Sequence, residues 1–164
     1  MTVLNTLKES ELLGGLETSK LRKLVTLCHE EFFREGMMVF KEGDEAKDLY
    51  ILMEGKVVLE MELRPLTNRP TISTAVDAII EGESFGWSAL IEPYVYTSSA
   101  RCVADSKVLA LKGDKLRQAL ADDHDLGYEV MKRLACLVSS RLMHTRITLT
   151  SERGLALLYR ELGT

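Results

Sequence analysis

The strongest constraint on the fold is the middle of the chain, where short apolar runs alternate with turn signals from residue 30 to residue 112. The runs are rich in β-branched and aromatic residues, and they cover residues 30–33, 37–40, 48–53, 56–63, 71–80, 96–104 and 106–112. The turn signals are Glu35-Gly36, Glu42-Gly43-Asp44, Glu54-Gly55, Pro65 to Pro70, Glu81-Gly82 and Ala104-Asp105. Many short strands at this spacing predict an antiparallel sandwich or jelly roll, and not a parallel sheet.

A helix is predicted on the N-terminal side of these strands. Apolar residues at spacings of three and four give residues 18–29 one apolar face, and Thr18 or Ser19 is the expected cap. The apolar residues are Leu21, Leu24, Val25 and Cys28.

The chain after Gly113-Asp114 returns to helical periodicity. We expect a short helix first and then a long helix over residues 126–148. Their apolar residues are Leu116, Ala119 and Leu120 in the first, and Leu126, Val130, Leu134, Val138 and Leu142 in the second. The long apolar face exceeds what a small β-roll can cover, so we expect a homodimer through residues 126–148. Packing of the helix on its own strands is the alternative. Residues 151–162 are expected to form one further short helix, closed by Gly163.

Composition and charge restrict the class of protein. A chain of 164 residues fits one domain, 1–164, with strands at about 30–112 and C-terminal helices at about 114–162. The net charge of -4 argues against duplex nucleic acid as the main partner. No apolar run reaches the length of a membrane span, and the N-terminus lacks the pattern of a secretion signal. Cys28, Cys102 and Cys136 are far apart beside apolar neighbours, which predicts reduced, buried thiols in a cytoplasmic protein.

Three segments share a pattern of glycines and aromatic residues. They are FFREGMMVFKEGDEAKDLYILMEGKVVL (32–59), GESFGWSAL (82–90) and YTSSARCVADSKVLAL (96–111). Together they resemble the cyclic nucleotide-binding domain of the catabolite-activator family, which is also found in kinase regulatory subunits and gated channels. The second segment resembles the family's phosphate-binding cassette, G-x-x-F-G-E-[LI]-A-L. The resemblance covers roughly residues 10–145. It implies a mainly β fold with α-helices: an eight-stranded antiparallel β-roll, jelly-roll-like, flanked by an N-terminal helix and a long C-terminal dimerisation helix.

Two positions depart from the family's cassette. The family's Glu, which binds the ribose 2′-hydroxyl, corresponds to Trp87, and its Arg, which pairs with the cyclic phosphate, corresponds to Tyr96. A phenol has neither the charge nor the bidentate geometry of a guanidinium. A charge-assisted hydrogen bond contributes about 1.5–3 kcal/mol, so we expect affinity for cyclic AMP to fall by at least about tenfold to a hundredfold. Arg101 lies five positions after Tyr96 and is expected on the opposite face of the strand.

The expected ligand site is therefore a modified cassette. Its residues are Phe85, Gly86, Trp87, Ser88, Ala89, Leu90, Tyr96, Thr97 and Ser98. Backbone N–H groups around Ser88-Ala89, with the hydroxyls of Thr97, Ser98 and Ser99, would still suit an oxyanion. Trp87 and Tyr96 either fill the pocket themselves or line it for a flat, weakly charged ligand. A replacement cation would have to come from Lys132, Arg133 or Arg141, which are expected on a solvated helix face.

These features favour a sensory or regulatory module with a non-standard ligand or no cyclic nucleotide. A structural dimerisation or protein-interaction domain with a plugged pocket is the alternative, and an ordinary cyclic AMP or cyclic GMP regulator comes third. The chain is not expected to be an enzyme, because it contains no Ser/His/Asp or Cys/His grouping in a supporting context.

Other cofactors and partners have little support in the sequence. His29, His124 and His144 lack the paired spacing of a zinc site, and three distant cysteines are too few for an iron–sulfur cluster. A haem held by His144 or His29 is left open as a minor alternative. A cyclic nucleotide or another small ligand is the cofactor to test first. The residues after 148 are too few for the winged helix-turn-helix of DNA-binding relatives, so no direct DNA binding is expected.

Overall fold

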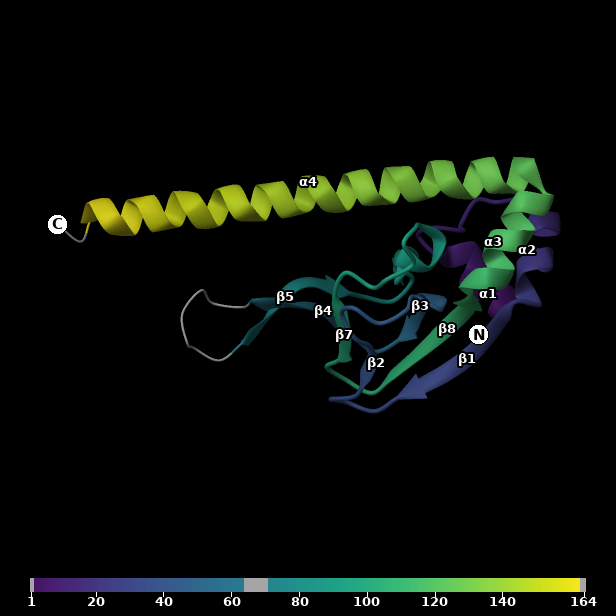
Figure 1. The fold of residues 1–164 in the computed structure, drawn as a ribbon, viewed down its shortest axis with the longest axis horizontal. Helices are drawn as coiled ribbons and strands as arrows, with labels where there is room; N and C mark the ends of the chain where they lie inside the picture. Colours follow the sequence, from purple (N-terminus) through teal and green to yellow (C-terminus); the bar gives the residue numbers. More distant parts are fainter. Residues whose placement is uncertain (1, 64–70, 163–164) are drawn as a thin grey trace.

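Eight strands form a β-roll in the computed structural model, which describes residues 2–63 and 71–162, with residues 155–162 described by their backbone alone (Figure 1). The strands are β1 (Cys28–Phe33), β2 (Met38–Phe40), β3 (Asp48–Glu54), β4 (Val57–Leu63), β5 (Ile72–Ile79), β6 (Ser84–Phe85), β7 (Ser99–Cys102) and β8 (Ser106–Lys112). They pair in two antiparallel sheets of four, ordered β1-β8-β3-β6 and β2-β7-β4-β5. The predicted antiparallel β-roll is confirmed.

The turns between strands explain the spacing of the glycines. Gly55, between β3 and β4, has a φ of 97°, and a Cβ atom there would lie 2.4 Å from the carbonyl oxygen of Asp105. Only glycine fits a turn that combines positive φ with so close a backbone contact. The predicted turn from Pro65 to Pro70 lies outside the described residues.

The helices gather on one side of the roll. They are α1 (Val3–Glu9), α2 (Thr18–Val25), α3 (Gly113–Asp122) and α4 (His124–Leu162), with a short 3₁₀ helix, η1 (Trp87–Leu90), between β6 and β7. Helices α1 to α3 lie near the start of α4, which runs along the roll and continues past it (Figure 1). No helix among the described residues combines the length and the apolar character needed to cross a bilayer.

Two apolar clusters hold these layers together. The inner cluster lies inside the roll and includes Tyr50, Leu52, Val108 and Ala110. The outer cluster joins the other face of β3 and β8 to the helices, through residues such as Leu49, Ile51, Leu109 and Leu111 of the strands and Leu126, Val130, Leu134 and Leu137 of α4. Successive side chains of a strand point to opposite faces, so the central residues of β3 (49–53) and β8 (108–111) are apolar on both faces.

The N-terminal part of the chain differs from the sequence-based prediction. The helix predicted over 18–29 ends at Val25, and Cys28 begins β1, where it pairs with Leu111. Glu17, not Thr18 or Ser19, occupies the N-cap position, and its side chain makes no capping hydrogen bond. Pairing with β8 explains the early end, because it draws residues 28–33 into the sheet. Helix α1 was not predicted.

The C-terminal part is one helix and not two. Residues 151–162 continue α4, which has 39 residues and is about 58 Å long at 1.5 Å per residue. The chain has no proline near residue 150, and Gly154 lies within α4 without ending it, so the helix continues through this region. The predicted closing residue Gly163 lies outside the described residues.

The cysteines are free, as predicted, but they are not all buried. Cys102 is buried and Cys28 half-buried, whereas Cys136 is exposed on α4. Burial raises the pKa of the Cys28 thiol to about 12. Cys136 is exposed because it lies on α4 next to Leu137, whose side chain faces the outer cluster, and points away from that cluster.

Candidate functional site

The expected cassette is built from β6, η1 and the loop that leads into β7. Phe85, Ala89 and Tyr96 point into the inner cluster of the roll. Leu90 and Trp87 instead belong to or pack against the outer cluster, on the side of the helices. Thr97 is exposed, and Ser88 and Ser98 are half-buried. The structure therefore separates Trp87 from Tyr96, which the sequence-based interpretation had placed in one pocket.

Tyr96 fills the place where the family's phosphate-binding Arg is expected. Its ring lies parallel to Phe40, with 3.7 Å between ring centroids and 10° between planes. Its hydroxyl donates to the carbonyl oxygen of Asp48 at 2.8 Å and accepts from the backbone N–H of the same residue at 3.2 Å. With only 4% of its surface exposed, Tyr96 has both its ring and its hydroxyl committed to the protein.

Three further aromatic rings surround Tyr96. We call Phe40, Tyr50, Phe85 and Tyr96 the aromatic cluster. Phe40 lies 5.8 Å from Tyr50 and 6.0 Å from Phe85, and Tyr50 lies 5.3 Å from Phe85, measured between ring centroids. Gly86 enters η1 with a φ of 74°, and a Cβ atom there would lie 3.1 Å from the Tyr50 ring. The backbone of the cassette therefore packs directly on the rings.

The aromatic cluster cannot supply a positive charge. Burial raises the pKa of the Tyr96 hydroxyl, and burial together with the nearby Tyr96 and Asp48 raises the pKa of Tyr50. Both phenols therefore stay neutral at physiological pH.

The polar groups expected to hold an oxyanion are partly in use. The N–H of Ala89 donates to the carbonyl oxygen of Gly86 at 3.1 Å, within the turn of η1. The Ser99 hydroxyl accepts a hydrogen bond from the N–H of Glu42 at 2.9 Å. A phosphate bound here would have to replace these two hydrogen bonds, which the folded chain makes within itself.

The arginines around the cassette are also committed. Arg101 lies on the outer face of its sheet, as predicted, and pairs with Glu60 at 3.1 Å. Arg133 donates to the carbonyl oxygen of Gly14. Arg117 of α3 donates to the carbonyl oxygen of Ala89 at 2.5 Å, and its guanidinium carbon lies 4.1 Å from the centroid of the Tyr94 ring. The contact of Arg117 with Ala89 supports the cassette from outside, and all three guanidinium groups are engaged in contacts within the fold.

The prediction that Arg141 lies on a solvated helix face is wrong. Its side chain is only 16% exposed and contacts the carboxylates of Asp77, Glu11 and Glu83. The sequence gives no local signal for this, because the three carboxylates come from separate parts of the chain.

A cavity of about 350 Å³ remains beside the aromatic cluster. Its lining residues are Val39, Phe40, Asp44, Glu45, Lys47, Asp48, Tyr50 and Tyr96. Three carboxylates face one lysine there, and burial raises the pKa of Asp48. Phe40 and Tyr50 were not among the predicted site residues; their position in strands that alternate inward and outward is the signal that could have identified them. The charge of this cavity is unfavourable for a phosphate.

Comparison with known proteins identifies what this arrangement is similar to. The model of the family described as the cyclic nucleotide-binding domain matches residues 30–123. A CRP-like cAMP-activated global transcriptional regulator of Mycobacterium tuberculosis is 27% identical over 121 residues, which cover 74% of this chain and 52% of the regulator. The chain thus spans about half the length of this relative.

Solved structures show the same fold. A Geobacter metallireducens protein that is named for cyclic nucleotide binding has a TM-score of 0.74 and 30% identity, and the match covers 87% of this chain and 99% of that one. The catabolite activator protein of Thermus thermophilus has a TM-score of 0.68 and 24% identity, with 88% and 63% covered. At 24% identity, the likeness to the Thermus thermophilus protein concerns the fold alone.

Proposed function

Because this chain belongs to the cyclic nucleotide-binding domain family, we propose that it is a regulatory module whose pocket takes neither cyclic AMP nor cyclic GMP and whose output passes through α4. The proposal combines the family's role with a cassette that lacks the usual Glu and Arg. It includes no contact with duplex DNA by this domain, because the net charge of -4 opposes one.

The position of Tyr96 is the observation that carries the proposal. At the position where the resemblance places the family's Arg, the phenol stacks on Phe40 and hydrogen-bonds to the backbone of Asp48. A phosphate entering here would lose its water without gaining a charged partner, and it would meet the carboxylates of the remaining cavity. The loss of hydration, the absence of a charged partner and the nearby carboxylates all oppose binding of a cyclic phosphate.

Calorimetric titration with cyclic AMP and cyclic GMP tests the proposal. The emission of Trp87, the only Trp, is followed in parallel, because η1 begins at this residue. We expect no saturable heat and no change in emission. Saturable binding in the micromolar range would overturn the proposal and restore the ordinary cyclic nucleotide regulator.

Variants at Tyr96 separate the loss of charge from the loss of space. The double variant Trp87→Glu, Tyr96→Arg restores both family residues and is expected to gain cyclic nucleotide binding. Tyr96→Leu removes the phenol without adding a cation and is expected to gain none. Circular dichroism and thermal unfolding confirm that each variant is folded. Equal binding by the two variants would mean that space, and not charge, was limiting.

A sensory role with a different ligand is the second candidate function. The cavity of about 350 Å³ beside Tyr50 and Tyr96 supports it, because its lining combines aromatic and acidic residues. Uncharged or cationic small molecules suit such walls. A thermal-shift screen of such compounds against the parent and against Tyr50→Leu would detect a ligand of this cavity.

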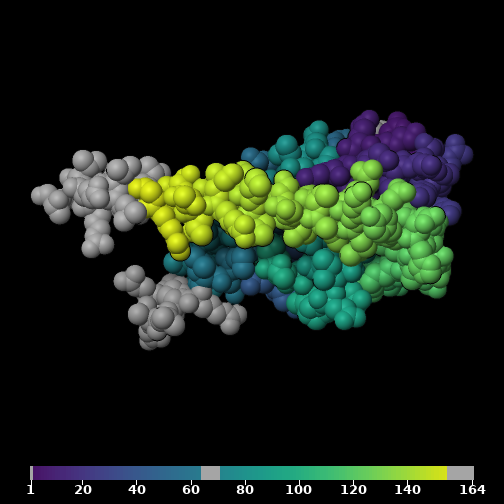
Figure 2. Space-filling view, turned by 90° about the horizontal axis from the view of Figure 1, so that it is seen from above, coloured from purple at the N-terminus to yellow at the C-terminus, as the bar shows by residue number. Residues whose placement is uncertain are grey.

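A second copy of the chain is the proposed partner of α4. The side chains of Leu126, Val130, Leu134 and Leu137 face the chain's own core. A separate set of exposed positions follows an alternating spacing of three and four residues: Tyr128, Met131, Ala135, Val138, Leu142, Thr145 and Leu149. In the space-filling view α4 lies on the surface, with no other described segment over its outer side (Figure 2). This heptad spacing is what a two-stranded coiled coil requires.

The dimer is tested by sedimentation or light scattering across a range of protein concentrations. Leu142, on the exposed seam, is 49% exposed in the single chain. Leu142→Glu is expected to shift the protein to monomer, whereas the matched variant Ser140→Glu, two positions earlier and off the seam, is expected to leave the dimer intact. A parent that stays monomeric at high concentration would contradict this part of the proposal alone.

A further inference from the structure

Arg141 connects the outer half of α4 to the rest of the chain. Between residues 138 and 154, every side chain of the helix is exposed except that of Arg141. The inner half is different, because four leucine and valine side chains bury it in the outer cluster. What positions the outer half must therefore involve Arg141.

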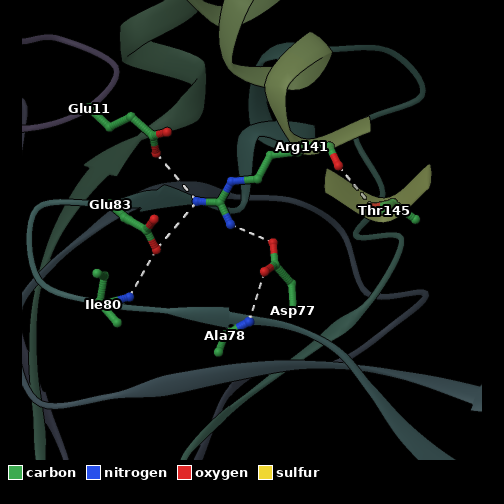
Figure 3. Close-up of polar contacts among 7 residues, drawn as sticks. All are labelled: Glu11, Asp77, Ala78, Ile80, Glu83, Arg141 and Thr145. Carbon is green, nitrogen blue, oxygen red and sulfur yellow. Dashed lines mark hydrogen bonds and ion pairs between the residues drawn. The ribbon is translucent and has the colours of Figure 1, made fainter. Parts of the chain in front are cut away.

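Arg141 is bound by carboxylates from three separate parts of the chain (Figure 3). Its Nη1 atom donates to Oδ2 of Asp77 in β5. Its Nη2 atom lies 3.3 Å from Oε2 of Glu11, between α1 and α2, and 3.5 Å from Oε2 of Glu83, which precedes β6. The contacts join α4 to a strand and to two loops.

Two of the three carboxylates, those of Asp77 and Glu83, accept further hydrogen bonds from the backbone. Asp77 Oδ1 accepts a hydrogen bond from the N–H of Ala78 at 2.9 Å, and Glu83 Oε2 accepts one from the N–H of Ile80 at 3.0 Å (Figure 3). Anchored acceptors lose little further freedom when the guanidinium binds, so the contact is better ordered than a pair of free surface side chains.

The guanidinium also reaches the cassette. Its central carbon lies 6.0 Å from the centroid of the Trp87 ring, at the limit of a cation–π contact. Trp87 begins η1, occupies the position of the family's ribose-binding Glu and is half-buried against the outer cluster. One side chain of α4 thus contacts both the charged cluster and the first residue of η1.

The charge of this cluster is stable. Burial lowers the pKa of Arg141, but the hydrogen bond to Asp77 and the charges of Asp77, Glu83 and Glu11 together raise it above its usual value. The half-buried position also shields the ion pairs from salt more than an exposed pair would be shielded.

We propose that Arg141 holds residues 138–154 of α4 against the roll when no ligand is bound. It does so by binding Asp77, Glu11 and Glu83 and by contacting Trp87, and we call this set of contacts the latch. Movement of this part of α4 then requires that the latch open. The inference rests on the proposed function only in taking α4 as the output element.

Hydrogen exchange of Arg141→Gln tests the latch. Exchange of the amides in residues 138–154 is expected to rise about tenfold, which corresponds to about 1.4 kcal/mol. Amides of residues 126–134 should keep their protection, because the outer cluster holds them. Arg146→Gln is the matched control, since it removes an exposed arginine from the same helix. Quenching of Trp87 emission by acrylamide should increase in Arg141→Gln and not in the control.

Two further variants separate the contact from the mere presence of a long side chain. Arg141→Lys keeps the charge but cannot bind three carboxylates in the same planar geometry, so exchange should rise by less than in Arg141→Gln. Asp77→Asn leaves the arginine in place and removes the negative charge of the side chain that its Nη1 atom contacts. It should also raise exchange in residues 138–154.

The outcome can be distinguished from the other proposals. An effect of dimerisation depends on protein concentration, whereas the latch is within one chain and should raise exchange equally at low and high concentration. Unchanged exchange in residues 138–154 of both Arg141→Gln and Asp77→Asn would overturn the latch. The nucleotide titration is independent of either result.

Discussion

Strands β3 and β8 have two buried faces, which are packed against different kinds of side chain. The face toward the helices meets aliphatic side chains, chiefly leucines. The face toward the inside of the roll meets the aromatic cluster, with Tyr96 bonded to the backbone of Asp48. Aliphatic packing depends mostly on volume, whereas the inner face also depends on ring geometry and on two specific hydrogen bonds. Changes to the aromatic interior can therefore leave the packing on the helical side unaltered.

The largest effect is expected from removal of an inner ring. Phe85→Ala deletes a fully buried side chain that touches Phe40 and Tyr50. The cavity and the lost transfer energy should reduce the free energy of unfolding by about 3–5 kcal/mol. Chemical denaturation measures the loss. A cost below that of Leu109→Met on the outer face would contradict the idea that the inner face is closely packed.

A smaller but more specific effect is expected from the Tyr96 hydroxyl. Tyr96→Phe keeps the ring on Phe40 but leaves the N–H and carbonyl groups of Asp48 without this partner. The expected loss of stability is about 1–3 kcal/mol. Tyr128→Phe, at an exposed position, serves as the control and should change stability little. If the two variants are equally stable, the hydroxyl contributes nothing to closing the pocket.

The outer face should tolerate a change of shape. Leu109→Met conserves volume in the aliphatic cluster and is expected to reduce the free energy of unfolding by less than about 1.5 kcal/mol. Thermal unfolding of this variant beside Tyr96→Phe compares the two faces directly. A cost clearly above that of Tyr96→Phe would remove the distinction between them.

The smallest effect is expected on the outer face of the second sheet, where Arg101 of β7 pairs with Glu60 of β4. Arg101 holds the pKa of Glu60 below its usual value, with help from Ser73. A lowered folded-state pKa stabilises the protein above the unfolded pKa, and this contribution is lost as the pH falls through the folded value. Arg101→Gln should therefore cost about 0–1 kcal/mol at pH 7. The difference in Tm from the parent should shrink at pH 3, and a constant difference would assign the effect to packing.

Much of the fold followed from local patterns. The strand over 106–112 was predicted at its observed bounds, and the glycine turns at 36, 43 and 55 are turns with positive φ. The end of α2 could not be predicted, because pairing of Cys28 with Leu111, far along the chain, converts a helical pattern into a strand. Local preference was overridden by the sheet.

The arrangement of the candidate site also depends on contacts between residues far apart in the chain. The sequence-based interpretation put Trp87 and Tyr96 in one pocket. It could not show that the two rings lie on opposite sides of the cassette backbone, because η1 turns Trp87 toward the helices while Tyr96 enters the roll.

The sequence by itself determined the antiparallel β-roll with flanking helices and the family, because these depend on residue type and spacing. Only the tertiary structure decided that the Tyr96 hydroxyl bonds to the backbone of Asp48 and that Arg141 joins α4 to the roll. Both depend on contacts between residues far apart in the chain. Tyr96 bonds to residue 48, and Arg141 meets residues 11, 77 and 83. Such contacts are set by the closure of the sheets and the path of α4, which no local pattern encodes.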